Sequence, residues 1–175
     1  WIWAKGVSDF DEMTNLSISL RNYLSTYFFF DKLKIVHQQR SVDETTKVLF
    51  ESLDGSNFEG VLIPGKDRIT ACISTQVGCA LNCAFCATGK LGFKRNLGIG
   101  EIFEQVFQLN KLSEKIFRRK LSNIVIMGMG EPLLNYDNTM RAIEHICHEN
   151  ELGFSPQRIT LSTAGIVDGI RRMAD

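Results

Sequence analysis

The sequence predicts an α/β fold in which parallel strands alternate with crossover helices, preceded by a small helical lobe and a β ribbon. Apolar residues recur at helical spacing near the start of the chain, and short strand-like runs separated by turn residues follow. From about residue 68 onward, strand and helix patterns alternate regularly. This alternation indicates parallel strands that are joined by helices.

The helical lobe is predicted for residues 1–30. Its apolar side chains recur three and four positions apart, as on one face of a helix, and they include Met13, Leu16, Leu20, Tyr23 and Tyr27. We expect this helix to pack on the larger part of the chain.

The β ribbon is predicted for residues 31–64. Three strand-like runs cover residues 34–37, 47–50 and 58–63. Asp54-Gly55 is a turn signal between two of them, and Pro64-Gly65 ends the last. An antiparallel ribbon is the simplest arrangement of these runs.

The remaining residues, 65–175, are predicted to form the core of the fold. Strands and helices are expected in alternation, at 68–75, 99–112, 123–129, 137–149, 158–163 and 166–173. In parallel sheets and barrels, ligands bind at the carboxyl ends of the strands. The loops at these ends, 76–98, 128–137 and 162–165, are therefore the expected site.

The composition is that of an ordinary globular protein, with 44% hydrophobic and 23% charged residues among 175. A formal net charge of zero gives no overall basic field that would attract nucleic acid. No apolar run approaches the roughly 20 residues that cross a bilayer, so no membrane association is expected. Five cysteines, three of them crowded together, favour a reduced cytoplasmic protein with a metal or redox site over a disulfide framework.

Cys79, Cys83 and Cys86 are the most informative residues, because they place three thiols on one loop in a C-x3-C-x2-C pattern. Three thiolates can hold a 4Fe-4S cluster and leave one iron free to bind a substrate. The alternatives are a structural zinc site, with Cys72 or a distant histidine as fourth ligand, and cysteines that merely pack in the core. Phe85 could cover the cluster, stack on a bound aromatic group or simply pack.

A second motif, Gly128-Met129-Gly130-Glu131-Pro132, follows the next predicted strand. Its glycines allow close approach of backbone to a ligand, and the Glu131 carboxylate can accept a hydrogen bond from an ammonium group. Taken alone, the motif is also compatible with a tight turn and a capping glutamate.

Together, the two motifs resemble those of the radical S-adenosylmethionine (SAM) enzymes. Further matches resemble the RlmN/Cfr branch of that family, and they lie at residues 5–7, 10–17, 74–81, 92–93, 95–97, 127–135 and 160–163. The resemblance implies one 4Fe-4S cluster, with SAM bound to its open iron. It also implies a partial, truncated radical SAM βα barrel as the core.

The activity implied by the resemblance is methylation of C2 of a specific adenosine in 23S rRNA and in certain tRNAs. It would proceed through a methylcysteine and a 5′-deoxyadenosyl radical, with flavodoxin or ferredoxin as electron donor and a monomeric enzyme. Three alternatives are methylation at C8 of the same adenosine, a different radical SAM enzyme that does not need Cys72, and a non-enzymatic zinc module of an RNA-binding protein.

The resemblance also implies roles for individual residues. Those for the cofactors are Cys79, Cys83 and Cys86 as cluster ligands and Gly130, Glu131 and Ser162 as SAM contacts. Cys72 would resolve the adduct between RNA and enzyme by forming a disulfide with the methyl-carrying cysteine. Glu59 would be the proton acceptor, with Cys72 as the other candidate for that step.

The alternation of side chains in the predicted strands agrees in part with the roles that the resemblance implies. Alternation in the strand at 68–75 places Thr70, Cys72 and Ser74 on one face, which suits a barrel lumen that holds a ligand. In the strand at 158–163, Thr160 and Ser162 likewise share a face. The remaining cysteine and the histidines, which are Cys147, His37, His145 and His148, are predicted to be core or surface residues without a chemical role.

RNA contacts are expected from local basic groups together with the helical lobe. These groups are Lys90, Lys94, Arg95 and the run Arg118-Arg119-Lys120, with ordinary solvated charge as the alternative. The methyl-carrying cysteine of the family has no counterpart in this sequence, which begins without methionine and stops inside a predicted helix. We therefore expect part of a longer protein that is inactive by itself.

Overall fold

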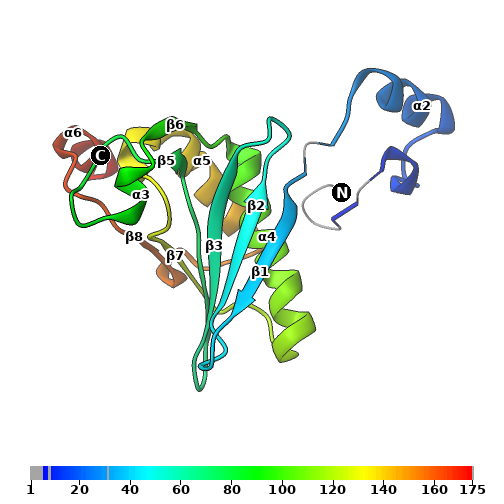
Figure 1. Ribbon diagram of the computed structural model, residues 1–175. Helices are drawn as coiled ribbons and strands as arrows, with labels where there is room; N and C mark the ends of the chain where they lie inside the picture. Colours follow the sequence, from blue (N-terminus) through cyan, green and yellow to red (C-terminus); the bar gives the residue numbers. More distant parts are fainter. Residues whose placement is uncertain (1–5, 8, 31, 175) are drawn as a thin grey trace.

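The computed structural model describes residues 6–7, 9–30 and 32–174, and it shows one mixed sheet with helices against it (Figure 1). The six strands of this sheet follow the order β1-β2-β3-β4-β7-β8. Their bounds are Lys34–Arg40, Thr46–Glu51, Asn57–Pro64, Ile69–Cys72, Asn123–Ile126 and Ile159–Leu161. β1 to β4 pair antiparallel, and β4, β7 and β8 pair parallel. The ribbon and the parallel core are therefore halves of one sheet.

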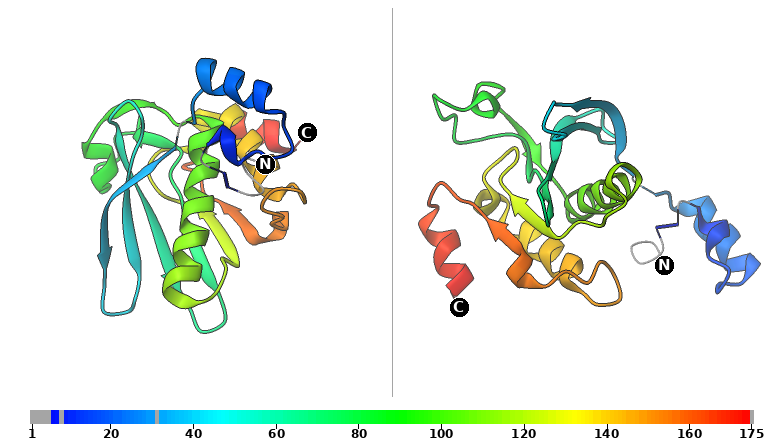
Figure 2. Two further views of the ribbon diagram at one scale, coloured as in Figure 1. Left: turned by 90° about the vertical axis from the view of Figure 1, so that its right-hand side faces the viewer. Right: turned by 90° about the horizontal axis from the view of Figure 1, so that it is seen from below.

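The helices follow the predicted order. They are α2 (Ile18–Tyr27), α3 (Ala87–Lys90), α4 (Ile99–Phe117), α5 (Tyr136–Cys147) and α6 (Val167–Ala174), with short 3-10 helices η1 (Phe10–Glu12), η2 (Pro132–Asn135) and η3 (Pro156–Arg158). A two-stranded hairpin, β5 (Gln76–Gly78) and β6 (Phe93–Asn96), stands apart from the main sheet. α4 and α5 pack together against one side of the sheet (Figure 2).

Helix α4 begins and ends at clear local signals. The Glu101 side chain accepts a hydrogen bond from the Gly98 backbone N–H at 2.8 Å, which satisfies a free donor at the helix start. Arg118 closes the helix in the left-handed conformation, with φ of 56°. Between these ends, Ile102, Val106 and Leu109 recur at helical spacing and are fully buried. This apolar stripe fixes the face that α4 presents to the sheet.

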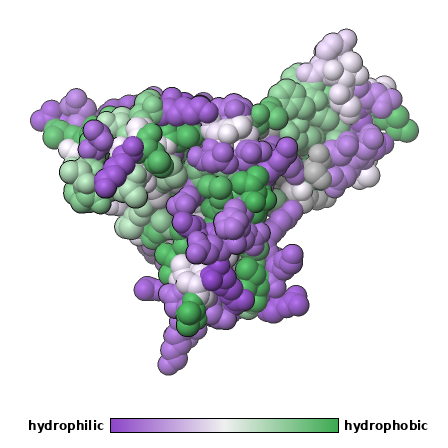
Figure 3. All heavy atoms as spheres, viewed as in Figure 1, coloured by the Kyte–Doolittle hydropathy of each residue, from purple (hydrophilic) through white to green (hydrophobic). Residues whose placement is uncertain are grey.

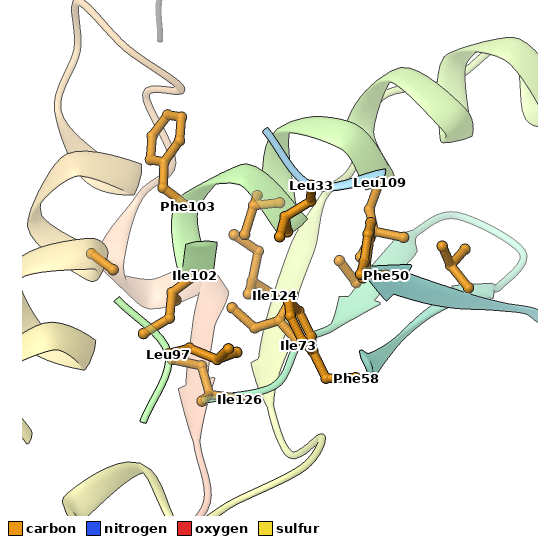
Figure 4. Packing of buried hydrophobic residues seen from close by; sticks show 14 of the residues in the cluster. Leu33, Phe50, Phe58, Ile73, Leu97, Ile102, Phe103, Leu109, Ile124 and Ile126 are labelled. Carbon is orange, nitrogen blue, oxygen red and sulfur yellow. The ribbon is translucent and has the colours of Figure 1, made fainter. Parts of the chain in front are cut away.

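The core between α4 and the sheet is apolar and continuous (Figure 4). Phe50 of β2 and Phe58 of β3 are directly paired in the ladder, and their ring centroids are 5.8 Å apart. Both are fully buried. Cross-strand aromatic pairs of this kind stabilise a sheet and define which of its faces turns inward.

The two faces of β4 differ as the alternation predicts. Ile69 and Ala71 are fully buried on the helix side, whereas Thr70 and Cys72 are only half-buried on the other. The prediction for this face of the strand is therefore confirmed as far as Cys72.

Three predicted strands are shorter than expected, and one of them is the strand predicted for 158–163, which covers only Ile159–Leu161. For β4, hydrogen bonds to other segments explain the early end. β4 ends at Cys72 and not at residue 75, because the Ser74 N–H bonds to the Gln105 side chain at 2.9 Å and leaves the ladder. The N–H groups of Thr75 and Gln76 both reach the Met129 carbonyl, at 2.9 and 3.2 Å. The strand predicted for 123–129 likewise ends at Ile126.

The leading lobe is helical, but it differs from the prediction. The helix starts at Ile18, capped by Ser17, and η1 precedes it. α2 buries none of its residues, and it lies away from the sheet in Figure 1. A hydrogen bond instead joins the segments that flank the lobe, since the Lys32 amine, just before β1, donates to the Val7 carbonyl at 2.9 Å. Part of the predicted lobe, residues 1–5 and 8, lies outside the described residues, as does residue 31 of the ribbon.

No helix among residues 6–7, 9–30 and 32–174 is long and apolar enough to span a membrane. Figure 3 shows polar residues over much of the visible face, interrupted by apolar groups.

Truncation of the paired rings tests the importance of this core. Phe58→Ala should lower the free energy of unfolding by about 3–5 kcal/mol, because a fully buried aromatic ring is replaced by a cavity. Urea unfolding of the protein measures the change. Phe85→Ala is the matched control, since Phe85 is 94% exposed, and it should leave the stability unchanged. Equal effects of the two substitutions would contradict this packing.

Candidate metal centre and cofactor site

The cysteine loop connects the two strands of hairpin β5–β6 and begins directly after β5. Gly78 has φ of +76°, and a Cβ at this position would collide with the Gly92 carbonyl oxygen. The Cys79 N–H donates to that same oxygen at 3.0 Å. Only glycine fits here, so this close approach of backbone fixes where the loop leaves the hairpin.

Cys79, Cys83 and Cys86 are all half-buried and unpaired. The Cys86 N–H donates to the Cys83 carbonyl at 3.0 Å, and Cys86 directly precedes α3. Hydrogen bonds from the backbone N–H groups of Gly89 and Thr88 lower the pKa of the Cys86 thiol. These backbone groups stabilise the thiolate form of Cys86, which is the form that binds metal.

The donors suit an iron–sulfur cluster in type, since such clusters are held by thiolates, and three of them would leave one iron of a cube without a protein ligand. Within the part of the chain that the structure describes, no three Cys, His, Asp or Glu side chains are gathered as around a single metal ion. The thiolates of a cube each bind a different iron, so they lie farther apart than the ligands of one ion. Cys79, Cys83 and Cys86 are thus the residues that would hold the group.

The loop after β7 lies against this hairpin. Gly130 has φ of +98°, and a Cβ there would lie 2.5 Å from the Cβ of Gln76 in β5. The Glu131 N–H donates to the Gln76 side-chain oxygen at 3.0 Å. The predicted SAM contacts and the cysteine loop therefore belong to neighbouring segments.

The Glu131 carboxylate is only 3% exposed and collects donors from two loops. Its Oε1 accepts from the Leu133 N–H at 2.9 Å and from the Thr163 hydroxyl at 2.8 Å. Its Oε2 accepts from the Ala164 N–H at 2.7 Å. In this structure the carboxylate joins the loop after β7 to the loop after β8.

Ser162, the third predicted SAM contact, comes directly after β8 and is exposed at the same end of the sheet. Its backbone N–H continues the parallel ladder by donating to the Ile126 carbonyl at 3.3 Å. The structure thus brings the loops after the first, second and third parallel strands together, as predicted from the topology.

Glu59 and Cys72 share the open face of the sheet. The register pairs Val61 with Cys72, and Glu59 lies two residues earlier on the same face of β3. The Glu59 side chain is 3.0 Å from the Lys47 amine, and its backbone carbonyl accepts from the Ser74 hydroxyl at 2.6 Å. The two predicted catalytic residues are therefore neighbours on adjacent strands.

Burial raises the pKa of the Cys72 thiol, partly offset by a hydrogen bond from the Met127 backbone N–H. Cys72 is a free cysteine in the structure, and so is Cys147. The disulfide implied for Cys72 involves a cysteine outside this sequence and stays a prediction. Cys147 is half-buried, and burial raises the pKa of its thiol.

The three histidines lie away from this site. His145 pairs with Glu151 at 3.0 Å beside the end of α5. His37 is exposed on β1, and His148 follows α5. That they carry no chemistry stays a prediction.

An arginine in β6 connects this hairpin to two other elements. Arg95 donates two hydrogen bonds of 2.8 Å to Glu101 in α4, and two of 2.8 and 3.2 Å to Asp54 in the β2–β3 turn. These bonds lower the pKa of Asp54. Burial acts to raise the pKa of Glu101, but bonds from Arg95, Ser52 and Gly98 outweigh it and keep that pKa low. Arg95 is thus engaged with carboxylates.

Comparisons with known proteins agree with this arrangement. The family model of the radical SAM superfamily matches residues 73–175, which is more than half of the chain. The chain belongs to the radical SAM superfamily. The matched region begins just before the cysteine loop and includes both cofactor motifs.

The comparisons also cover the rest of the chain. The family model of the ribosomal RNA large subunit methyltransferase N-terminal domain matches residues 1–29. The probable dual-specificity RNA methyltransferase RlmN of Flavobacterium psychrophilum is 49% identical over 175 residues, which are 100% of this chain and 50% of the relative. The protein of the same description from Thermotoga maritima is 48% identical over 176 residues, again 100% of this chain and 50% of the relative.

A solved structure is similar to this chain in both fold and sequence. The crystal structure of a radical SAM methyltransferase from Sphaerobacter thermophilus matches with a TM-score of 0.89 and 42% sequence identity. The match covers 99% of this chain and 51% of that one. The chain spans about half the length of the curated relatives that it matches. The resemblance to the RlmN/Cfr branch, predicted from the motifs, is confirmed.

Several residues of the site were not singled out from the sequence. Gln76 and Asn135 are buried polar residues that join the loops, and Asn135 donates to the Thr75 and Leu97 carbonyls at 2.8 Å each. Thr163 binds Glu131. All three lie within the matching segments 74–81, 127–135 and 160–163, but their roles depend on contacts between segments that are distant in sequence.

Substitution of Gly130 tests the close packing of the two loops. Gly130→Ala should lower the free energy of unfolding by about 2–3 kcal/mol, because the new methyl group would lie 2.5 Å from Gln76 Cβ at a φ that favours glycine. Thermal unfolding of the variant and the wild type measures this loss of stability. In Gly55→Ala, the φ of +75° is similar but no atom lies within 4 Å, so only backbone strain of about 1 kcal/mol should remain. The same loss in both variants would contradict the steric argument.

Removal of Arg95 tests the connection to α4 and the β2–β3 turn. Arg95→Met should cost about 1–2 kcal/mol near pH 7, because Glu101 loses its charged partner. The lowered carboxyl pKa values stabilise the fold above their unfolded values of about 4, and this contribution is lost as pH falls through the folded values. The variant should therefore lose less stability than the wild type between about pH 5 and pH 3.

Urea unfolding at a series of pH values checks this expectation. Arg171→Met is the control, because Arg171 and Asp168 are 3.9 Å apart and strongly exposed. A pH profile of Arg95→Met that runs parallel to the wild type would show that the two carboxylates do not depend on Arg95.

Proposed function

We propose that the protein to which this chain belongs is a radical SAM methyltransferase that modifies C2 of adenosine in 23S rRNA and tRNA. The observation that carries the proposal is the contact between the two cofactor motifs. The strand that leads into Cys79 holds the Glu131 N–H through Gln76, at 3.0 Å. A cluster on the cysteine loop and a SAM molecule held by Gly130, Glu131 and Ser162 would therefore be neighbours.

The names of the relatives support RNA as the substrate, since they are described as probable dual-specificity RNA methyltransferases RlmN. We propose C2 over C8 methylation on the strength of these relatives. A different radical SAM enzyme would not need a thiol in the position of Cys72.

The bound cluster and SAM would supply the radical chemistry that a weakly nucleophilic ring carbon requires. The residues of this chain would do the rest. Cys79, Cys83 and Cys86 would hold the cluster, and the half-buried open face of the sheet would face the substrate base. Glu59 on that face would accept the ring proton, and Lys47 at 3.0 Å keeps a positive charge beside its carboxylate.

Cys72 would act after the carbon–carbon bond has formed. Its thiol lies on the same face as Glu59, one strand away. Burial, which raises the pKa of the Cys72 thiol, keeps it protonated until a base takes the proton. As a thiolate it would attack the sulfur of the methyl-carrying cysteine. The S–S bond forms, the bond between that sulfur and the methylene carbon breaks, and the carbon keeps the electron pair and takes up a proton to become the methyl group of the released RNA. This leaves Glu59 as the better candidate for the proton acceptor.

We also propose that β4, β7 and β8, with α4 and α5, are the first units of a βα barrel. Residues 1–30, 31–64 and 65–175 would be the lobe, the ribbon and this half-barrel. RNA would meet basic groups near the cysteine loop, of which Lys90 is exposed. Lys94 donates to Ser56 at 2.7 Å, and Arg95 is engaged with Asp54 and Glu101, so these two contribute less to RNA binding. A flavodoxin or ferredoxin would supply electrons.

The proposal is tested with the full-length protein prepared without oxygen. We expect about four irons per chain, an electron paramagnetic resonance signal that changes when SAM is added, and methylated adenosine after incubation with RNA and reductant. Cys83→Ser should lose the iron. Cys147→Ser is the matched control, because it changes a half-buried thiol on α5 outside the loop, and it should keep both iron and activity.

Two results would contradict the proposal. A colourless protein that contains zinc would favour a non-enzymatic module. A Cys72→Ala variant that still releases free methylated RNA would favour a different radical SAM reaction, since the proposed chemistry needs this thiol to free the product.

A further inference from the structure

Gln76 is a buried glutamine in β5, three residues before Cys79, and only 1% of it is exposed. Its side-chain oxygen accepts from the Glu131 N–H at 3.0 Å, and its amide NH₂ donates to the Asn96 side-chain oxygen at 2.8 Å. Both ends of the side chain are thus satisfied by different segments. A buried amide with two such partners is costly to disturb, because either loss leaves a polar group without a hydrogen bond.

The backbone around Glu131 also lies directly on Gln76. A Cβ at Gly130 would be 2.5 Å from the Gln76 Cβ and 2.6 Å from its Cγ. The Gln76 N–H reaches the Met129 carbonyl at 3.2 Å. The segment 129–131 therefore touches Gln76 at its backbone, at its methylene groups and at its amide.

The sheet itself does not set this separation. β5 pairs only with β6, and β7 pairs with β4 and β8, so no ladder joins the cysteine hairpin to β7. β7 has ended at Ile126, four residues before Gly130. The distance between the cysteine loop and the Gly130–Glu131 segment therefore depends on contacts outside the ladders. These are the backbone bonds of Thr75 and Gln76 to the Met129 carbonyl, and side chains such as that of Gln76, which bonds both to Glu131 and to Asn96 in β6.

We propose that Gln76 is a positioning residue that holds the Gly130–Glu131 segment at a fixed place relative to the cysteine loop, and that it thereby sets the affinity for SAM. This inference rests on the proposed function of the site. Gln76 would touch neither cluster nor SAM. It would act through Glu131, whose backbone it holds, and through Asn96 at the end of β6.

The test compares Gln76→Leu with Gln108→Leu in the full-length protein, purified without oxygen. Gln108 is a matched control because its side-chain amide also bonds to two partners, the Leu33 carbonyl at 2.5 Å and Glu104 at 2.9 Å, and neither partner belongs to the cysteine loop or to the Gly130–Glu131 segment. Three quantities are measured: the iron content, the SAM concentration that half-saturates the change in the electron paramagnetic resonance signal, and amide hydrogen exchange of residues 127–135.

We expect Gln76→Leu to keep its iron, to need about tenfold more SAM for half-saturation, and to exchange the Glu131 amide at least about tenfold faster, as the loss of a buried hydrogen bond implies. Gln108→Leu should match the wild type in all three. Asn96→Ala removes the acceptor of the Gln76 NH₂ together with the long 3.5 Å bond from the Asn96 amide to the Leu134 carbonyl, and it leaves the bond between Gln76 and Glu131 in place. It should show a smaller shift of about threefold, and it carries the test if Gln76→Leu does not fold.

Each outcome is decisive. Unchanged SAM half-saturation in a folded Gln76→Leu, or in Asn96→Ala where that variant carries the test, overturns the inference. Loss of iron in parallel with SAM affinity also overturns it, because Gln76 would then support the cysteine loop as a whole. Failure of the wild type to respond to SAM defeats the proposed function itself, and faster exchange at Glu131 in the variant would then be a structural effect only.

Discussion

The site depends on a buried carboxylate that has no cation beside it among its hydrogen-bond partners. Glu131 is 3% exposed, and its oxygens are satisfied by the Leu133 N–H, the Thr163 hydroxyl and the Ala164 N–H. A carboxylate that is removed from water without such donors is strongly unfavourable. The loops after β7 and β8 must therefore close around Glu131, and this closure forms the end of the sheet at which the cysteine loop lies.

At this end of the sheet, side chains form hydrogen bonds with backbone groups that elsewhere in the sheet are paired between neighbouring strands. β4 leaves the ladder after Cys72 because Gln105 takes the Ser74 N–H, and the Ser74 hydroxyl donates to the Glu59 carbonyl. The Ser74 Oγ also accepts from the Met129 N–H at 2.8 Å. Serine and glutamine replace main-chain partners here, which frees the backbone to diverge and opens space at the strand ends. A regular ladder would have kept these strands together and left no room for a ligand.

The order and type of the elements could be predicted from the sequence, because amphipathic spacing is a local property. The stripe of Ile102, Val106 and Leu109 specifies α4, and the alternation of Ile69, Thr70 and Ala71 specifies which face of β4 is buried. The cysteine loop and the Gly-Glu motif were also found, since each is contiguous. Arg95 was predicted to contact RNA, but the structure pairs it with Glu101 and with Asp54, 41 residues earlier. Such partners come together only through the fold, and a charge run does not reveal them. For the same reason the sequence does not reveal the role of Gln76, although this residue lies in the matching segment 74–81.

The contacts that fix the cysteine loop lie at its base, where it joins the hairpin, and this affects how the loop would bind a metal. The hairpin is fixed by the contact between Cys79 and Gly92, and by Arg95 in β6. Beyond Cys79, the three thiols are half-buried, and Phe85 between the last two is 94% exposed. Few apolar contacts order this stretch, so its conformation is set by backbone bonds within the loop and by whatever its thiolates bind. Metal binding and local ordering are coupled in such a segment, because part of the binding free energy is used to fix the chain. The rigid half of the site, around Glu131 and Gln76, would then act as the template against which the cysteine loop is ordered.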